Sequence, residues 1–265
     1  MEKINRWALI LGASSGFGAA TAIQLAKDGM NIFGVHLDLK ATIAHAEEVI
    51  RQIQSQNVEA VFFNCNAAEE SNMVEIVTAI EKKFEAIPGS TIQVLLHSLA
   101  FGSLKPFISE NPAEEMPKGR MDTTIDVMAN SLVYWVQKLV AKKLMSKGGR
   151  IFAMTSAGSS RVWKSYGAVS AAKAALESHI RQLALELAPL GITANAILAG
   201  VTDTPALRKI PGYEKMLEIS LRKNPGGRST VPEDIAKVIS LFSREETGWM
   251  TGNTIRIDGG ESIVE

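Results

Sequence analysis

The fold is decided by the stretch Leu11-Gly12-Ala13-Ser14-Ser15-Gly16-Phe17-Gly18. An apolar run, Trp7–Leu11, precedes the glycines, and a helical pattern, Phe17–Lys27, follows them. Glycines at such a junction allow a tight turn, which lets backbone N–H groups at the helix N-terminus approach a phosphate. The strand before and the helix after make this common motif specific. The stretch therefore predicts a nucleotide-binding unit whose phosphate contacts come from Gly12, Ser14, Ser15, Gly16, Phe17 and Gly18.

Strand and helix patterns alternate along the rest of the chain. The other expected strands are Asn31–His36, Ala60–Cys65, Ile92–His97, Arg150–Thr155, Thr193–Ile197 and Thr254–Ile257. The other expected helices are Ala41–Gln56, Asn72–Phe84, a long one around Thr123–Met145, Ser170–Ala188 and Pro232–Phe242. Continuous apolar strands separated by helices are typical of a parallel sheet with both faces covered. No linker rich in Pro, Ser or Gly interrupts the pattern. We therefore predict one doubly wound, Rossmann-like α/β domain of about seven strands across residues 1–265.

One segment, Thr204–Asn224, does not fit the simple alternation. It is amphipathic and helix-like but is interrupted by Ile210-Pro211-Gly212. It follows the end of a strand, which is the edge where α/β folds bind ligands. We interpret residues 204–224 as a lid over the substrate, with a plain surface helix as the alternative.

Composition excludes several classes of function. The chain has 28 basic and 28 acidic residues, so no global field attracts it to nucleic acid or to an anionic membrane. Hydrophobic residues make up 46% of the sequence, yet no apolar run reaches the length of about 18 residues expected of a membrane span. Met1–Trp7 is polar and does not resemble a signal peptide. With one cysteine, Cys65, and four histidines without ligand spacing, we expect a cytoplasmic protein that holds no metal.

The end of the second expected strand bears on the choice of dinucleotide. An acidic residue at this place binds the adenosine ribose hydroxyls, whereas a basic residue accepts a 2′-phosphate. The chain offers His36-Leu37-Asp38-Leu39-Lys40, in which Asp38 and Lys40 have opposite preferences. His36 either contacts the ribose or simply ends the strand. We expect NADPH in slight preference to NADH.

A tyrosine and a lysine, Tyr166 and Lys173, carry most of the chemical signal. They follow the expected strand that ends Met154-Thr155-Ser156, and they are seven residues apart. Next to a nucleotide-binding loop, a phenol and an ammonium group are suited to act as the acid and the orienting cation of a reductase. Taken alone, Tyr166 would be interpreted as a structural residue and Lys173 as a solvated one.

With these residues in place, the chain resembles the short-chain dehydrogenase/reductase family over residues 5–263. Asn66-Ala67 stands where the family contacts adenine, and Asn130 stands where the family has an asparagine that holds a proton-relay water. The stretch Asn195–Gly200 matches the segment that approaches the nicotinamide, and Asp258-Gly259-Gly260 matches the family's last strand end. The resemblance implies that the cofactor also contacts His97, Ser98, Gly200, Val201, Thr202 and Thr204. It further implies a homotetramer, with the long helices and the C-terminal strand at its interfaces.

Three departures narrow the resemblance. Ordinary members place the tyrosine four residues before the lysine, where this chain has Val169. They also carry Asn-Asn-Ala-Gly where this chain has His97-Ser98-Leu99-Ala100, and Pro-Gly where it has Ala199-Gly200. These substitutions are similar to those of bacterial enoyl-acyl-carrier-protein reductases, especially the type III, NADPH-using branch found in bacilli. Like that branch, the chain has a serine, Ser156, ten residues before the tyrosine.

The spacing suits reduction of a carbon–carbon double bond. On a helix, a separation of four residues rises about 6 Å and one of seven about 10.5 Å, so the phenol moves one turn farther from the lysine. In an enoyl thioester, hydride adds to Cβ while charge develops on the thioester oxygen, and donors must aim at that oxygen. The resemblance implies that Tyr166 binds the oxygen, that Lys173 binds the nicotinamide ribose and lowers the phenol's pKa, and that Ser156 and Asn130 assist. We also expect Gly167 to let Tyr166 enter the site from the loop before the helix.

The sequence leaves three functions open. The first is an NAD(P)H-dependent enoyl reductase of fatty acid synthesis, acting on acyl-carrier-protein or coenzyme A thioesters. The second is a 3-oxoacyl (carbonyl) reductase of the same family. The third is an inactive nucleotide-sensing protein, suggested by Val169. Basic residues in the lid segment either steer an acidic carrier or coenzyme A phosphates, or form a solvated face; they are Arg208, Lys209, Lys215, Arg222 and Lys223.

Overall fold

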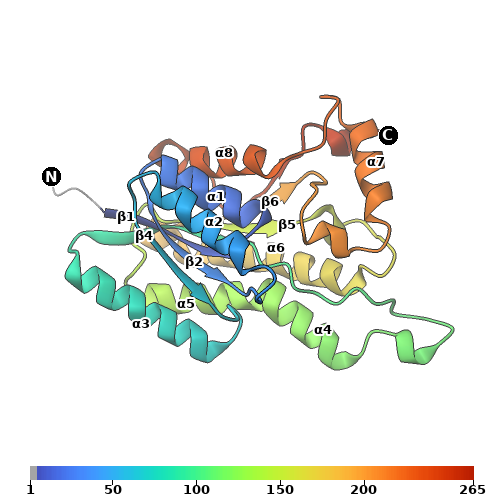
Figure 1. Cartoon of the computed structure of the whole chain (residues 1–265), viewed down its shortest axis with the longest axis horizontal. Coiled ribbons are helices and arrows are strands. Elements are labelled where there is room, and N and C mark those ends of the chain that lie inside the picture. The colour runs from blue at the N-terminus through green and yellow to red at the C-terminus, as the bar shows by residue number, and fades with distance from the viewer. Residues whose placement is uncertain (1–4) are drawn as a thin grey trace.

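A computed structural model describes residues 5–265, and residues 1–4 lie outside the described part, together with most of the segment that bears on a signal peptide. Seven parallel strands form one sheet in the order β3-β2-β1-β4-β5-β6-β7 (Figure 1). The strands are β1 (Asn5–Leu11), β2 (Asn31–His36), β3 (Ala60–Asn64), β4 (Ser90–His97), β5 (Arg150–Thr155), β6 (Thr193–Ala199) and β7 (Thr254–Ile257). The predicted single-domain Rossmann-like sheet of seven strands is confirmed.

Helices cover both faces of the sheet (Figure 1). They are α1 (Gly16–Lys27), α2 (Ile43–Gln54), α3 (Glu70–Ala86), α4 (Lys118–Ile125), α5 (Ser131–Ala141), α6 (Gly167–Leu187), α7 (Tyr213–Lys223) and α8 (Pro232–Phe242). One core cluster joins the sheet to α3, α5 and α6, and a second joins it to α1, α2 and α8. The alternation of side chains along β1 explains the two layers: Leu9 and Leu11 enter the first cluster, whereas Ala8 and Ile10 enter the second. Each large apolar side chain buried in this way contributes about 2 kcal/mol.

The strand order reverses between β1 and β4, and the crevice of such a fold opens at this place. Both strands end at this edge in register, with Leu11 beside His97. The next residues continue the contact, because the N–H of Ser98 donates to the carbonyl of Leu11 at 2.9 Å. The sheet thus places the glycine-rich loop and the His97-Ser98 pair side by side, although they are far apart in sequence.

The helices differ from their predicted boundaries most clearly at two places, whereas α1, α2 and α3 differ by one or two residues at an end. The helix predicted around Thr123–Met145 consists of α4, a π-helical turn (Asp126–Asn130) and α5, and it begins just after Pro117. α5 ends at Ala141 and not at Met145, because Lys143 adopts a φ of +54°, which a right-handed helix does not accommodate. The helix predicted from Ser170 begins three residues earlier, at Gly167. Among residues 5–265, every helix is too short or too polar to cross a bilayer.

Candidate active site

The glycine-rich loop joins β1 to α1 at the carboxyl edge of the sheet. Gly12 and Gly16 have φ of +91° and +53°, which glycine adopts without strain. A Cβ on Gly18 would overlap the carbonyl oxygen of Gly12, so only glycine lets α1 approach the loop this closely. In the part of the chain that the structure describes, Ser15 makes no side-chain capping bond, and the ring of Phe17 is partly buried against the core. The first-turn N–H groups are therefore available to the phosphates of a dinucleotide.

Asp38 lies at the rim of this crevice, two residues past β2. Its carboxylate is 2.9 Å from Nδ1 of the buried His36 and lies beside Ser14 and Thr42. Burial raises the pKa of Asp38, but hydrogen bonds from Ser14, Thr42 and His36 outweigh it and keep the pKa below its usual range. Asp38 is therefore an anion next to the glycine-rich loop. We predicted that His36 either ends the strand or contacts the ribose. In the structure it is the last residue of β2, and its ring forms a hydrogen bond with the Asp38 carboxylate.

The turn after β3 is held by several hydrogen bonds. The side-chain oxygen of Asn66 accepts from the N–H of Ala68, and its carbonyl accepts from the side chain of Asn72, both at 3.0 Å. The carbonyl of Ala67 accepts from the buried indole N–H of Trp135 at 2.8 Å. These bonds fix the backbone of the turn. The adenine contacts of Asn66 and Ala67 stay predictions.

His97 is fully buried at the end of β4. Its Nε2 lies 2.8 Å from the Ser131 hydroxyl, which itself donates to the carbonyl of Val127 at 2.8 Å. Because that hydroxyl proton is already used, Nε2 must carry the hydrogen in this contact. Burial, followed by the nearby charge of Lys173, lowers the pKa of His97 to about 3. His97 is therefore a neutral residue that fixes the π-helical turn beside the site.

The backbone before α6 places Tyr166. Ser165 has a φ of +61°, a left-handed conformation that is uncommon for a residue other than glycine. Tyr166 is the next residue and the N-cap of α6, so it enters the site from the loop as predicted. The role predicted for Gly167 is wrong, because Ser165 makes the turn. Gly167 instead leaves room for the ring of Phe107, which a Cβ would strike.

Two of the predicted catalytic residues, Ser156 and Tyr166, lie side by side. The Tyr166 hydroxyl lies 3.4 Å from Oγ of Ser156, which also accepts from the N–H of Gly158 at 3.2 Å. Gly158 admits the Tyr166 ring, because a Cβ there would lie 2.5 Å from Cε1 of the ring. Burial raises the pKa of Tyr166 above its ordinary value, against a smaller lowering by Ser156. The prediction that Lys173 lowers this pKa is wrong, because desolvation of the phenol dominates.

Lys173 lies inside α6 with only 5% of its surface exposed. Its Nζ donates to the carbonyl of Met154 at 2.7 Å, which holds the ammonium against the end of β5. Burial lowers the pKa of Lys173 to about 8, and Glu177 acts in the opposite direction. The lysine is thus a buried cation that loses its charge in mildly alkaline solution. It is not the solvated lysine of the alternative interpretation.

Asn130 ends the π-helical turn, and its side chain contacts a different partner from the rest of the site. Its Oδ1 lies 3.0 Å from Nε2 of His179 on α6. The structure therefore joins Asn130 to α6, and it does not join the Asn130 side chain to Ser156 or Tyr166. The water-holding role of Asn130 stays a prediction.

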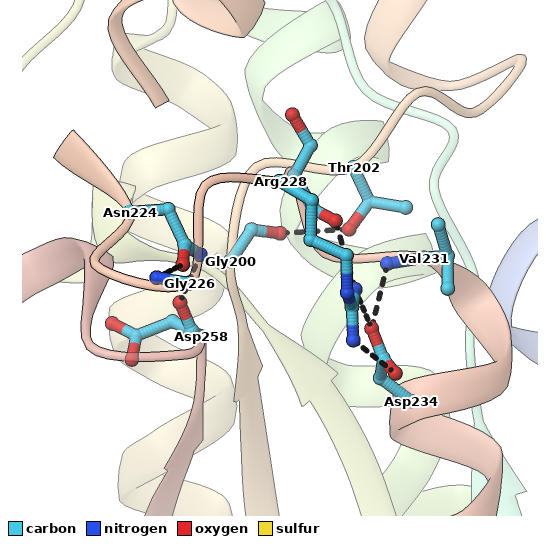
Figure 2. Close-up of polar contacts among 9 residues, drawn as sticks. Gly200, Thr202, Asn224, Gly226, Arg228, Val231, Asp234 and Asp258 are labelled. Atoms are coloured by element: carbon cyan, nitrogen blue, oxygen red, sulfur yellow. Dashed lines mark hydrogen bonds and ion pairs between the residues drawn. The ribbon is translucent and has the colours of Figure 1, made fainter. Parts of the chain in front are cut away.

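Figure 2 shows polar contacts of the loop after β6, to which Gly200 and Thr202 belong. The hydroxyl of Thr202 donates to the carbonyl of Gly200 at 2.9 Å. The N–H of Val201 donates to Oε2 of Glu261 at 3.0 Å. A Cβ on Gly16 would lie 3.4 Å from the methyl group of Thr204, so this loop closes onto the glycine-rich loop. Gly200, Val201, Thr202 and Thr204 therefore all lie on the segment that faces the predicted phosphate site.

The segment of residues 204–224 starts from this loop and ends on the C-terminal tail. Gly212 has a φ of +77° and is the N-cap of α7. At the other end, Nδ2 of Asn224 donates to the carbonyl of Asp258 at 3.0 Å (Figure 2), and the Ser220 hydroxyl donates to Glu261 at 2.6 Å. The loop that follows is held by Arg228, whose guanidinium contacts Asp234 at 2.6 and 2.9 Å (Figure 2).

Sequence reasoning missed two parts of the site. The first is the long loop of residues 98–117 between β4 and α4. It brings the ring of Phe107 against Gly167 at the start of α6. The second is Glu177, whose Oε1 accepts from the hydroxyl of Thr155 at 2.7 Å. Glu177 follows Lys173 by one helical turn, and this spacing was the only sequence signal that pointed to it.

Fold and site together define an α/β protein with one parallel sheet, a glycine-rich loop after its first strand, and a buried lysine and a phenol on α6. The sequence profile of the family described as "Enoyl-(Acyl carrier protein) reductase" matches residues 12–262. The chain belongs to the short-chain dehydrogenase/reductase family of oxidoreductases.

The chain is similar to proteins with different reactions. It is 29% identical over 258 residues to a 1-cyclohexenylcarbonyl-CoA reductase of Streptomyces collinus, covering 97% of this chain and 86% of that protein. It is 26% identical over 259 residues to a 3-oxoacyl-[acyl-carrier-protein] reductase of Staphylococcus epidermidis, covering 97% and 99%. Its fold matches that of the enoyl-[acyl-carrier-protein] reductase (NADH) of Aquifex aeolicus with a TM-score of 0.83, at 22% identity and with 98% and 97% covered.

Proposed function

We propose that the protein is an NAD(P)H-dependent enoyl thioester reductase, which reduces the C2=C3 bond of 2-enoyl groups carried by acyl carrier protein or coenzyme A in fatty acid synthesis. The observation that carries the proposal is the placement of the Tyr166 hydroxyl. It lies beside Ser156 at the N-cap of α6, about two turns before Lys173. The Tyr-x6-Lys spacing supports the enoyl-reductase branch, type III included, as part of this proposal.

The residues fit a reduced nicotinamide dinucleotide, which supplies hydride to Cβ of the substrate when bound. The test of fit is the loop itself: α1 approaches so closely that Gly18 has no room for a Cβ. The first-turn N–H groups would bind the pyrophosphate, and the loop of Gly200–Thr204 would bind the carboxamide. Lys173, fixed on Met154, would bind the nicotinamide ribose.

Tyr166 would act on the substrate through its hydroxyl. Its raised pKa keeps the phenol protonated, so it donates a hydrogen bond where negative charge develops on the thioester oxygen. Ser156 would orient that hydroxyl or bind the same oxygen. The proton that reaches Cα can come from Tyr166, and Lys173 contributes positive charge near the developing anion.

The choice between NADPH and NADH now has evidence on both sides. The anionic Asp38 beside Ser14 favours NADH, because a carboxylate accepts ribose hydroxyls and repels a 2′-phosphate. Lys40 is exposed two residues further on and favours NADPH. Paired titrations with the two coenzymes decide this point.

A 3-oxoacyl reductase is the second candidate, and one observation favours it. The Ser156 and Tyr166 hydroxyls lie within 3.4 Å, so both could donate to a single carbonyl oxygen. The similarity to a 3-oxoacyl reductase of Staphylococcus epidermidis is consistent with this alternative. Both candidates need a reduced coenzyme, so its consumption alone does not separate them.

The test compares two substrates and one variant. We expect crotonyl thioesters to drive NAD(P)H oxidation and acetoacetyl thioesters to drive it far more slowly. Tyr166→Phe should lower turnover by about 100-fold, because it removes a positioned proton donor. Coenzyme affinity, measured by nicotinamide fluorescence, should stay unchanged in this variant. Preference for the acetoacetyl thioester would replace the enoyl proposal with the ketoreductase, and wild-type turnover in Tyr166→Phe would remove the phenol from either mechanism.

Carrier and assembly belong to the same proposal. The lid segment exposes Lys209, Lys215 and Arg222, while Arg208 pairs with Asp203 at 2.7 and 2.8 Å. The unpaired charges would attract an acidic carrier or coenzyme A phosphates. We also propose a homotetramer, for which the exposed Trp249 next to β7 offers a contact.

A further inference from the structure

Glu177 is an acidic side chain that the chemistry described so far leaves without a role. It lies on α6, four residues after Lys173, so the two side chains emerge on one face of the helix. Its carboxylate does not reach Lys173 as a salt bridge. It accepts instead from the hydroxyl of Thr155 at 2.7 Å.

The partner of Glu177 shows that its position is fixed. Thr155 is the last residue of β5 and is nearly fully buried. The preceding residue, Met154, accepts from Nζ of Lys173 at 2.7 Å. Two consecutive residues of one strand thus hold two side chains from consecutive turns of α6. This double contact fixes the distance between the carboxylate and the ammonium group.

We propose that Glu177 is a positioning residue which, anchored by Thr155, keeps Lys173 charged at the nicotinamide ribose. The inference rests on the proposed function in one respect, the placement of Lys173 at the ribose. The physical reason is the cost of burying a lone cation, which a nearby anion reduces. The carbonyl of Met154 gives the ammonium a hydrogen-bond acceptor, and Glu177 gives it the countercharge.

The other ionisable groups around α6 do not supply this countercharge. His97 on β4 is neutral, because its pKa lies at about 3. On the π-helical turn, burial and the like charge of Glu69 raise the pKa of Asp126. The charge that acts on Asp126 is thus that of Glu69 and not that of Lys173. Arg150 lies at the opposite end of β5.

The other ionisable groups considered near α6 are neutral or exposed to solvent. Tyr166 is a neutral phenol, because burial raises its pKa above the ordinary value. The ionisable side chains of α4 (Lys118, Arg120 and Asp122) are exposed to solvent, and water screens their charges. Between pH 7 and 9, the titration that affects the ribose site is therefore that of Lys173.

The experiment measures the affinity for reduced nicotinamide dinucleotide between pH 6 and 9.5, by fluorescence, in the full-length protein. In the wild type, affinity should weaken as pH rises through about 8, where Lys173 loses its proton. In Glu177→Gln the midpoint should fall by about one pH unit, because the group that raises the lysine pKa is gone. Thr155→Val should shift the midpoint in the same direction by less, and Thr155→Ser should restore it.

Two further variants make the result specific. Glu186→Gln removes an exposed carboxylate of the same helix, which accepts from Gln182, and should leave the midpoint unchanged. Lys173→Met should abolish the transition. A thermal melt of each variant reports folding, and if Glu177→Gln does not fold, Thr155→Val carries the test.

Two outcomes would overturn the inference. One is a Glu177→Gln midpoint equal to that of the wild type, with or without an equal loss of affinity at every pH, since a merely structural role would give that result. The other is a wild-type profile as flat as that of Lys173→Met. Absence of turnover on any enoyl thioester would refute the proposed reaction alone, because coenzyme binding is measured without a substrate.

Discussion

Ser165 stores backbone strain next to the phenol on which the site depends. Its φ of +61° costs about 1 kcal/mol in a residue that has a Cβ. The conformation is held by the bonds around it, including the one from the N–H of Tyr166 to the carbonyl of Trp163 at 3.1 Å. Strain of this kind is retained where it sets the position of a functional side chain.

Ser165→Val should therefore damage the site through the backbone. A β-branched residue strongly disfavours this conformation, so we expect a loss of about 1–2 kcal/mol in the free energy of unfolding. Turnover should fall by more than about 10-fold as the phenol moves. Ser165→Gly, which adopts the same φ without strain, should retain turnover. Denaturant melts and steady-state kinetics measure the two effects, and an active, fully stable Ser165→Val would show that the turn does not place Tyr166.

Gly18 is the second residue whose backbone decides function. A Cβ there would meet the carbonyl of Gly12, and neither backbone can move without opening the loop. Gly18→Ala should cost about 1–3 kcal/mol of stability through overpacking and should weaken coenzyme binding by at least about 10-fold. The matched control is Gly119→Ala in α4, where a Cβ meets nothing within 4 Å and helix propensity improves. Equal coenzyme affinities in the two variants would contradict the close-approach explanation.

Asp38 carries a prediction about the choice of coenzyme at the same scale. Asp38→Asn keeps the shape of the side chain but removes its negative charge, so NADPH affinity should rise by about 10-fold relative to NADH. Fluorescence titrations with both coenzymes measure the ratio. Asp122→Asn, which removes an exposed carboxylate from α4, should leave the ratio unchanged. If Asp38→Asn leaves the ratio of NADPH to NADH affinity unchanged, the adenosine ribose does not bind next to Asp38.

Trp163 joins two elements of the site. Its indole N–H donates to the carbonyl of Pro211 in the lid segment at 3.2 Å, while its own carbonyl accepts from the N–H of Tyr166. The far end of the segment is held by the bonds of Ser220 and Asn224 to the C-terminal tail. The position of residues 204–224 is thus linked to the loop that carries the phenol. The lid role of this segment stays a prediction, with the plain surface helix as its alternative.

Trp163→Phe should loosen the lid while it keeps an aromatic ring in place. The lost indole bond removes about 1 kcal/mol of attachment, so we expect a several-fold rise in KM for the thioester and unchanged coenzyme affinity. Trypsin should also cleave faster at Arg208 and Lys209, because the segment opens more often. Tyr134→Phe, a half-exposed aromatic residue on α5, is the control. Identical KM and cleavage rates in Trp163→Phe and the wild type would argue for a rigid surface helix.

The elements also explain what the sequence could predict. Continuous apolar strands such as Ile92–His97 and the glycine-rich loop have local signals, so the sheet and the tight turn between β1 and α1 were predictable. The pairing of Asn130 with His179, and that of Thr155 with Glu177, depends on how α6 packs across the sheet. No local pattern encodes such contacts. Ser165 shows a third limit, because serine carries no sequence signal for a left-handed backbone.

For the whole molecule, the outer side of the sheet near β7 combines an open strand edge with exposed apolar side chains. β7 pairs only with β6, so its other edge is open within the described chain. Trp249, just before this strand, is 99% exposed, and Leu241 on α8 is about half exposed. An open edge beside large exposed apolar side chains is the kind of surface that a second copy of the chain covers.

Assembly through this surface gives the last prediction. If Trp249 is buried between copies, Trp249→Glu places a charge in an apolar contact and should lower the oligomeric state from the proposed tetramer, because an unpaired buried charge costs several kcal/mol. Sedimentation velocity over a range of concentrations measures the change. Glu246→Gln, an exposed neighbour, should leave the assembly intact. A tetramer in Trp249→Glu would exclude this edge and direct attention to α5 and α6, whereas a monomeric wild type would contradict the tetramer itself.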